Sequence, residues 1–142
     1  MKKYMSMVIF GLLSLVSIAQ NPDDAKLHDK LKANIGNDAE YIQSMYGTEK
    51  GDRLEGGAFS MNLVAGVLYR FTMGTSASSE VDVYVNLYLG YDKMFIKQQR
   101  VEPGKVASFE YRCEKTGDYA IRLTFKEKGK SYTEIILSKV KK

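Results

Sequence analysis

The sequence predicts a mainly β fold, an antiparallel, jelly-roll-like β-sandwich of about seven strands with a short N-terminal helical segment. Two observations support this prediction. From residue 57 onward, apolar and polar residues alternate in short runs. These runs recur about every ten residues and are separated by glycine-containing turns. The 142-residue chain has a single cysteine, so packing must stabilise it without an internal disulfide bridge.

The first 19 residues have the pattern of a secretory signal peptide. Two lysines precede an apolar run over residues 5–16, and Ser17 and Ala19 are the small residues that a signal peptidase needs. The run is shorter than the roughly 20 apolar residues that a membrane anchor requires. We therefore expect residues 1–19 to be removed, no stable membrane span afterwards, and a periplasmic or secreted mature protein.

An N-terminal helical segment and loop are expected over residues 20–56. Residues 21–36 carry helix signals, with Leu27, Leu31 and Ile35 on one apolar stripe and a glycine at the end. For residues 38–46 the pattern fits either a second short helix or a strand. Glycines and charges without periodicity then mark a loop over residues 48–57.

The β-sandwich domain is expected over residues 57–142. The runs 59–63 and 67–73 flank a small-residue turn and predict a hairpin. Residues 81–89 form the longest alternating run and predict a central strand. The remaining expected strands cover residues 94–101, 107–113, 119–128 and 132–140.

Three segments carry a resemblance to a known family, namely AFSMNLVAGVLYRFTM, VNLYLGYDKMFIKQ and FEYRCEKTGDYAIRLTF. They are similar to the pre-peptidase C-terminal type of bacterial secreted β-sandwich, a jelly-roll-like module often attached to exported hydrolases. The resemblance covers residues 57–139 and rests on turn and packing motifs, so it concerns architecture more than activity. It implies a free-standing copy of the module that acts through a partner, a ligand or a surface.

Some members of that family bind calcium through clustered acidic residues near the central strand. In this chain Asn86 stands at the apparent acidic position, and the remaining acids Glu80, Asp82 and Asp92 are scattered. A hard cation needs six to eight oxygen ligands at close range. We therefore expect no metal site and no cofactor.

The charge balance excludes an obvious nucleic-acid function. Without the two lysines near the N-terminus, 19 basic residues face 17 acidic ones, which leaves a net charge of about +2. Lys139, Lys141 and Lys142 are assigned no role, because a frayed and solvated C-terminus explains them. We expect no nucleic-acid partner.

The chain is also short of catalytic side chains. His28, the single histidine, lies among charged residues of the first helix, where a solvated imidazole is expected. Cys113 follows two aromatic residues on the same strand face, so it is expected to be an inert, buried residue, although an exposed reactive thiol is the alternative. We do not expect an enzyme.

The candidate ligand-binding residues are Asp82, Tyr84, Asn86 and Tyr88, which project from the reverse face of the central strand. We expect the tyrosines to stack on successive sugar rings and Asn86 to bind hydroxyl groups. The alternative is that the apolar stripe of the first helix covers this face.

These observations predict an exported, non-catalytic binding or accessory module with a carbohydrate as its candidate ligand. The alternative is a secreted protein–protein interaction partner, such as a hydrolase inhibitor or a subunit of an envelope complex, which would use the loop GTSASSE at residues 74–80.

Overall fold

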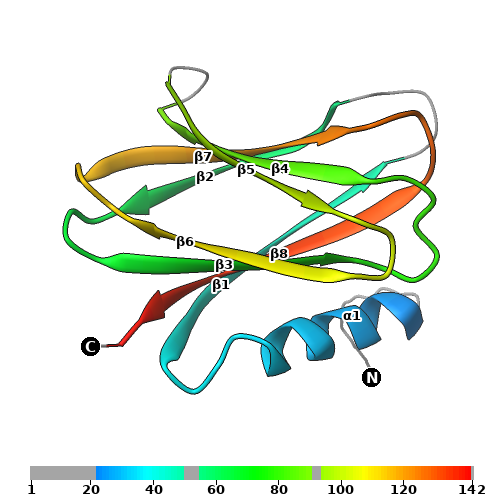
Figure 1. Cartoon of the computed structure of the whole chain (residues 1–142), viewed down its shortest axis with the longest axis horizontal. Coiled ribbons are helices and arrows are strands. Elements are labelled where there is room, and N and C mark those ends of the chain that lie inside the picture. Colours follow the sequence, from blue (N-terminus) through cyan, green and yellow to red (C-terminus); the bar gives the residue numbers. More distant parts are fainter. Residues whose placement is uncertain (1–21, 50–54, 91–93, 142) are drawn as a thin grey trace, which may run out of the picture.

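The computed structural model describes residues 22–49, 55–90 and 94–141, which form one helix and eight strands (Figure 1). The elements are α1 (Pro22–Ala33), β1 (Ala39–Glu49), β2 (Glu55–Leu63), β3 (Leu68–Thr75), β4 (Val83–Leu89), β5 (Met94–Val101), β6 (Val106–Arg112), β7 (Gly117–Phe125) and β8 (Ser131–Val140). The predicted signal peptide, Asp92 and Lys142 lie outside the described residues.

The strands form two four-stranded antiparallel sheets that pack face to face. The strand order is β1-β8-β3-β6 in the first sheet and β2-β7-β4-β5 in the second. This is the strand order of a jelly roll, so the predicted fold class is confirmed. The β4 strand lies between β7 and β5, as expected for the longest alternating run.

The structure has eight described strands instead of about seven, because the ambiguous segment after the helix is a strand. β1 pairs along its length with β8, from Ala39 opposite Val140 to Glu49 opposite Ser131. A register shift between Tyr41 and Gln43 accommodates one extra residue. Pairing with β8 therefore decided between the two conformations that the local pattern allowed.

The predicted hairpin at residues 59–73 is wrong. β2 pairs with β7 in the second sheet, whereas β3 pairs with β6 and β8 in the first. The turn itself exists, since Gly66 has a φ of +87° and the Val67 amide donates to the Val64 carbonyl at 3.2 Å. A turn between alternating strands looks the same in sequence whether it closes a hairpin or crosses between sheets. Among the described strands, only β4 and β5 are both consecutive and paired.

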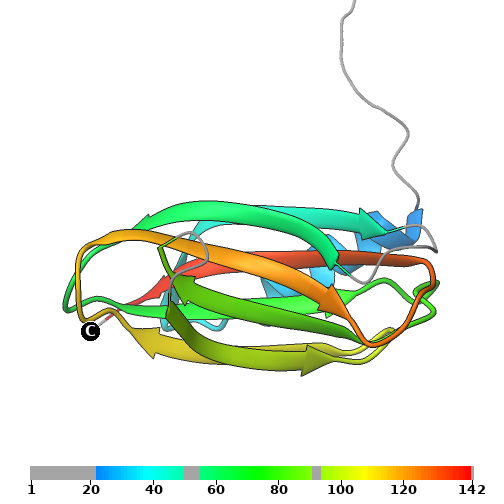
Figure 2. The same cartoon turned by 90° about the horizontal axis from the view of Figure 1, so that it is seen from above.

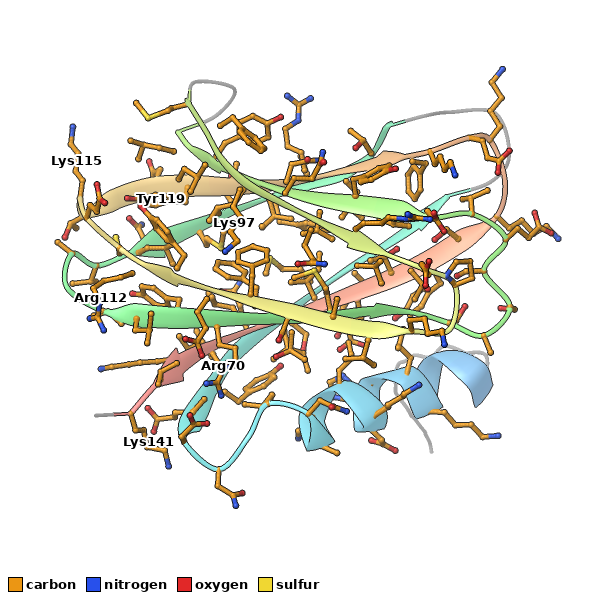
Figure 3. All side chains as sticks on the ribbon, viewed as in Figure 1. Arg70, Lys97, Arg112, Lys115, Tyr119 and Lys141 are labelled. Carbon is orange, nitrogen blue, oxygen red and sulfur yellow. The ribbon has the colours of Figure 1, made fainter. Side chains whose placement is uncertain are left out.

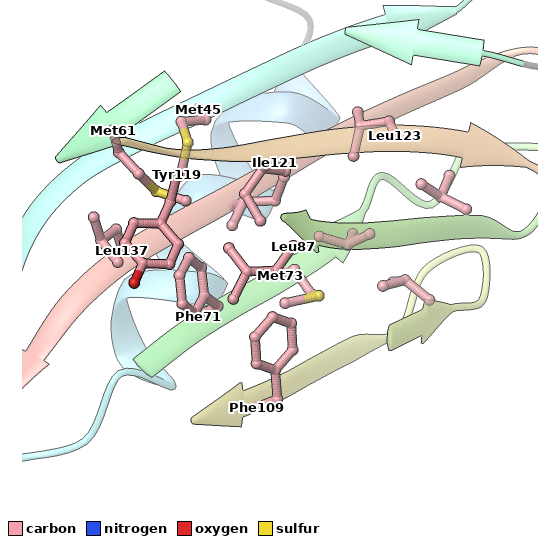
Figure 4. Packing of buried hydrophobic residues seen from close by; sticks show 14 of the residues in the cluster. Met45, Met61, Phe71, Met73, Leu87, Phe109, Tyr119, Ile121, Leu123 and Leu137 are labelled. Atoms are coloured by element: carbon pink, nitrogen blue, oxygen red, sulfur yellow. The ribbon is translucent and has the colours of Figure 1, made fainter. Parts of the chain in front are cut away.

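Side chains of alternate positions from both sheets fill the core. Phe71 of β3 and Phe109 of β6 stack with ring centroids 4.9 Å apart, and Leu87 and Tyr119 face them from the second sheet (Figure 4). Each fully buried side chain of this size contributes roughly 1.5–3 kcal/mol from burial. Cys113 is 1% exposed, so the predicted burial of the thiol is confirmed.

Helix α1 packs on the outer surface of the first sheet, on the far side of the molecule from β4 and β5 (Figures 1 and 2). The predicted stripe of Leu27, Leu31 and Ile35 is buried and contacts Ile136 of β8. The helix therefore covers a different face from the one that carries the candidate ligand-binding residues. The expected alternative, in which the helix hides that face, is wrong.

Candidate functional site

The outer surface of the second sheet carries the candidate site. Along β4, the fully buried Val83, Val85 and Leu87 point into the core, so the residues between them point outward. Cross-strand pairing places Tyr84 opposite Arg100 and Tyr88 opposite Phe95. The outward-pointing residues of β4 and β5 that form this surface, called here the aromatic face, are Tyr84, Asn86, Tyr88, Phe95, Gln98 and Arg100.

The two tyrosines are half-buried, and the ring beside them is more exposed. Tyr88 meets Phe95 edge to face with the ring centroids 5.8 Å apart, and Phe95 is 56% exposed. Tyr84 and Tyr88 are four residues apart, a distance of about 13 Å along an extended strand. This corrects the expectation that the tyrosines stack on successive sugar rings. A glycan bound across both tyrosines must contact them through sugar rings that are not adjacent.

Asn86 is buried and its amide is used within the sheet. It is 3% exposed, and its Nδ2 donates to the Arg122 carbonyl at 3.0 Å and to Thr124 Oγ1 at 3.2 Å. Its Oδ1 accepts a hydrogen bond from Gln98 Nε2 at 2.7 Å. The expected role of Asn86 is therefore corrected: it holds the exposed Gln98 in place instead of offering its own amide to a ligand.

Asp82 has a similar supporting role. Its side chain is 12% exposed and accepts a hydrogen bond from Arg100 Nε at 2.8 Å. This hydrogen bond is the main reason that the pKa of the Arg100 guanidinium lies above its usual value. Glu102 lies 3.5 Å from the same guanidinium. Asp82 thus fixes the orientation of Arg100 at the border of the aromatic face.

Two of the scattered acids, Glu80 and Asp82, are bonded to different groups. Glu80 Oε1 accepts a hydrogen bond from the Lys130 amide, and Asp82 is paired with Arg100. Across residues 22–49, 55–90 and 94–141, no group of three or more His, Cys, Asp or Glu side chains could hold a metal ion. In the same ranges the structure contains no candidate membrane-spanning helix, since α1 has only 12 residues.

The loop at residues 74–80 offers less surface than its sequence suggests. Ser76 and Ser79 are buried and hydrogen-bond each other at 3.2 Å, and the Tyr132 amide donates to Ser79 Oγ at 3.1 Å. Its serine hydroxyls therefore hold the loop against the start of β8. Ala77, Ser78 and Glu80 remain exposed.

The structure also reveals a polar pair that the sequence did not indicate. Glu134 of β8 is completely buried beneath helix α1, and His28 Nδ1 contacts its Oε2 atom. The expectation of a solvated His28 is wrong, since 31% of its side chain is exposed and the ring faces this carboxylate. Glu134 shares a strand face with the apolar Ile136, and only the docking of a helix 106 residues away in sequence brings the two groups together.

Near the other end of the core, Cys113 and Tyr119 bond to one another and to the backbone. The thiol donates toward the Tyr119 hydroxyl at 3.4 Å, and that hydroxyl donates to the Lys115 carbonyl at 2.6 Å. Burial, followed by these hydrogen bonds, raises the pKa of the Tyr119 phenol far above its usual value. The Tyr119 phenol therefore remains neutral, and both buried side chains contribute to packing.

Comparisons with known proteins identify no family. No protein-family model matches this sequence, and no curated protein is detectably similar to it. Among solved structures, the chain is similar to one from a study entitled "Bacillus endospore appendages form a novel family of disulfide-linked pili". The alignment has 12% sequence identity and a TM-score of 0.38, and it covers 73% of this chain and 88% of the other.

Proposed function

We propose that this protein is an exported, non-catalytic binding module of the pre-peptidase C-terminal type and that its aromatic face binds a glycan. The main support is the outer surface of the second sheet, where Tyr84, Tyr88 and Phe95 lie together on β4 and β5. The apolar faces of aromatic rings pack on the apolar faces of sugars, and polar groups beside them bind hydroxyls.

Gln98 and Arg100 are the polar groups best placed for this purpose. Both are exposed, and each is held by a less exposed partner, Asn86 or Asp82. A side chain that is already held in one orientation loses less conformational entropy when a ligand binds. The aromatic face thus combines exposed rings with preorganised hydrogen-bonding groups.

The test is a double substitution, Tyr84→Ala with Tyr88→Ala, probed on a glycan array and by titration with any glycan that the wild-type protein retains. We expect the double variant to lose at least about tenfold in affinity, because each stacked ring contributes roughly 0.5–1.5 kcal/mol beyond its buried area. The matched control is Tyr41→Ala with Tyr46→Ala, which removes two exposed tyrosines from the first sheet.

Urea unfolding of each variant separates a loss of binding from a loss of folding. If the wild-type protein is retained by no glycan, or if the two double variants lose retention equally, the proposed ligand or the proposed face is wrong.

A second candidate function is binding to another protein through the edge strand β5. Met94 and Phe95 are 58% and 56% exposed at its start, and exposed apolar side chains of this size often mark interaction sites. An edge strand also offers backbone groups that can pair with a strand of another chain. Met94→Lys should abolish capture of such a partner from envelope extract while leaving glycan retention unchanged.

A further inference from the structure

A second candidate site lies at the end of the sandwich where the chain terminates. A concavity of about 470 Å³ is formed there by the turn between β2 and β3 and by the ends of β6 and β8. Its volume falls within the range of small-molecule sites in proteins. Three basic residues, Arg112, Lys139 and Lys141, line it together with Glu40, which lies directly opposite Lys139 in the pairing of β1 with β8. Figure 3 shows Arg112 and Lys141 at this end of the molecule.

The fold fixes the guanidinium of Arg112 and the backbone of Lys139 and Lys141. Arg112 donates from one terminal nitrogen to the Gly66 carbonyl at 2.9 Å, which leaves its other N–H groups for a ligand. Lys139 belongs to β8, and the backbone amide of Lys141 donates to the Asp38 carbonyl at 2.7 Å. For Lys139 and Lys141 the expectation of a frayed C-terminus is therefore wrong, although both are exposed, and Lys142 lies outside the described residues.

Two other carboxylates at this end are already paired with a different cation. Asp38 and Glu110 both accept hydrogen bonds from Arg70. Among the residues that the structure describes, Glu40 is the one acidic residue that lines the concavity. The formal charges of the lining residues sum to +2, and Asp38, outside the lining, also interacts electrostatically with Lys141.

We propose that this concavity binds the phosphate group of a phosphomonoester. A phosphate monoester carries about −1.5 to −2 charges at neutral pH, which matches the local charge better than a carboxylate or a phosphodiester does. The guanidinium of Arg112 suits two parallel hydrogen bonds to phosphate oxygens, and the lysines supply point charges. The remaining volume beside Val67 and Leu68 accommodates an apolar part of the ligand.

The probe is glycerol 3-phosphate, titrated into the whole mature protein at pH 7.5 and followed by amide chemical shifts in NMR spectra. We expect saturable shifts around the concavity and affinity at least about tenfold weaker for Arg112→Ala, the cost of losing a charge-assisted hydrogen bond. Glu40→Gln should bind more tightly than the wild-type protein, because it removes the only negative charge from the lining. Both substitutions affect exposed side chains, so the variants should fold.

The control variant Lys126→Ala with Lys128→Ala removes two exposed lysines from the turn between β7 and β8, at the opposite end of the sandwich. It should bind like the wild-type protein. Acetate serves as a monoanionic control ligand. Vesicles of phosphatidylglycerol in phosphatidylcholine present phosphodiester groups at a lipid surface. The proposal is overturned if glycerol 3-phosphate causes no saturable shift, if acetate binds equally well, if the control variant loses as much affinity as Arg112→Ala, or if the vesicles alone are bound.

Discussion

At the level of single residues, the complete burial of Glu134 has an energetic cost. Its side chain is completely inaccessible, and its Oε1 atom has no hydrogen-bond partner among the described residues. A buried carboxylate is expensive unless a paired group compensates it. His28 of helix α1 is that group, so the docked helix and the buried glutamate depend on one another.

This dependence predicts the effect of removing the imidazole. His28→Ala should lower the free energy of unfolding by about 2 kcal/mol or more, because it leaves the buried Glu134 carboxylate without a partner. Replacing both residues with apolar ones, as in His28→Leu with Glu134→Met, should restore most of the loss. Urea unfolding measures both effects, with Lys26→Ala as a control at an exposed position of the same helix. Equal stability of the His28→Ala and Lys26→Ala variants would contradict the assigned role.

A second residue-level feature is the bridge that Arg70 makes between the first sheet and the segment after the helix. Its guanidinium donates to Asp38 Oδ1 at 2.7 Å, to Glu110 Oε2 at 2.9 Å and to the Ile35 carbonyl at 2.7 Å. The hydrogen bond from Arg70 holds the pKa of Asp38 below its usual value.

The lowered pKa of Asp38 predicts a sensitivity to acid. A carboxyl group whose pKa is lower in the folded chain stabilises the fold above the unfolded pKa, and this contribution is lost as the pH falls through the folded pKa. Asp38→Asn should therefore melt below the wild-type protein at pH 7, and the difference should shrink below about pH 4. Thermal melts between pH 2.5 and 7 check this, and a difference that is constant with pH would count against the interaction.

At the level of elements, a glycine in β3 determines how closely helix α1 approaches the first sheet. A Cβ atom on Gly74 would lie 3.0 Å from the Lys105 carbonyl oxygen and 3.1 Å from a methyl carbon of Leu27 and of Leu31. Since Gly74 lies opposite Glu134 in the neighbouring strand, the missing side chain creates the space into which the leucines fit.

Gly74→Ala should therefore move the helix away from the sheet. We expect a loss of about 1–2 kcal/mol in the free energy of unfolding, as for other overpacked sites, together with faster tryptic cleavage within α1. Gly117→Ala is the matched control, because an added Cβ there meets no atom within 4 Å. Equal protease resistance of the two variants would show that the contact at Gly74 does not hold the helix.

Strand β1 is an element that the local sequence pattern could not identify as either a helix or a strand. Tyr41, Ile42 and Tyr46 are 44%, 43% and 52% exposed, so these three apolar residues lie largely on the surface. Aromatic and β-branched residues favour strands, but the partner strand β8 lies about 90 residues later in the chain. Only pairing over that separation distinguishes the strand from a helix.

At the level of the whole molecule, the jelly-roll order determines which surfaces remain accessible. Most consecutive strands belong to different sheets, so the chain crosses repeatedly between layers and leaves one outer face on each. Helix α1 covers part of the first outer face, and the aromatic face lies on the second. The topology thus separates the proposed glycan surface from the proposed phosphate site at the end of the sandwich.

The sequence by itself determined the fold class, the helix, the central strand and the outward direction of Tyr84 and Tyr88. These features depend on the period of apolar residues and on helix and turn signals, which act over a few neighbouring positions. The buried Cys113 followed from the same alternation.

The tertiary structure alone decided which strands pair, that β2 and β3 lie in different sheets, and that Asn86 is committed to Gln98. It also brought His28 to Glu134 and placed Arg112 beside the C-terminal lysines. Each of these contacts joins distant parts of the chain. Their energies arise only when the two sheets and the helix assemble, so no local pattern contains them.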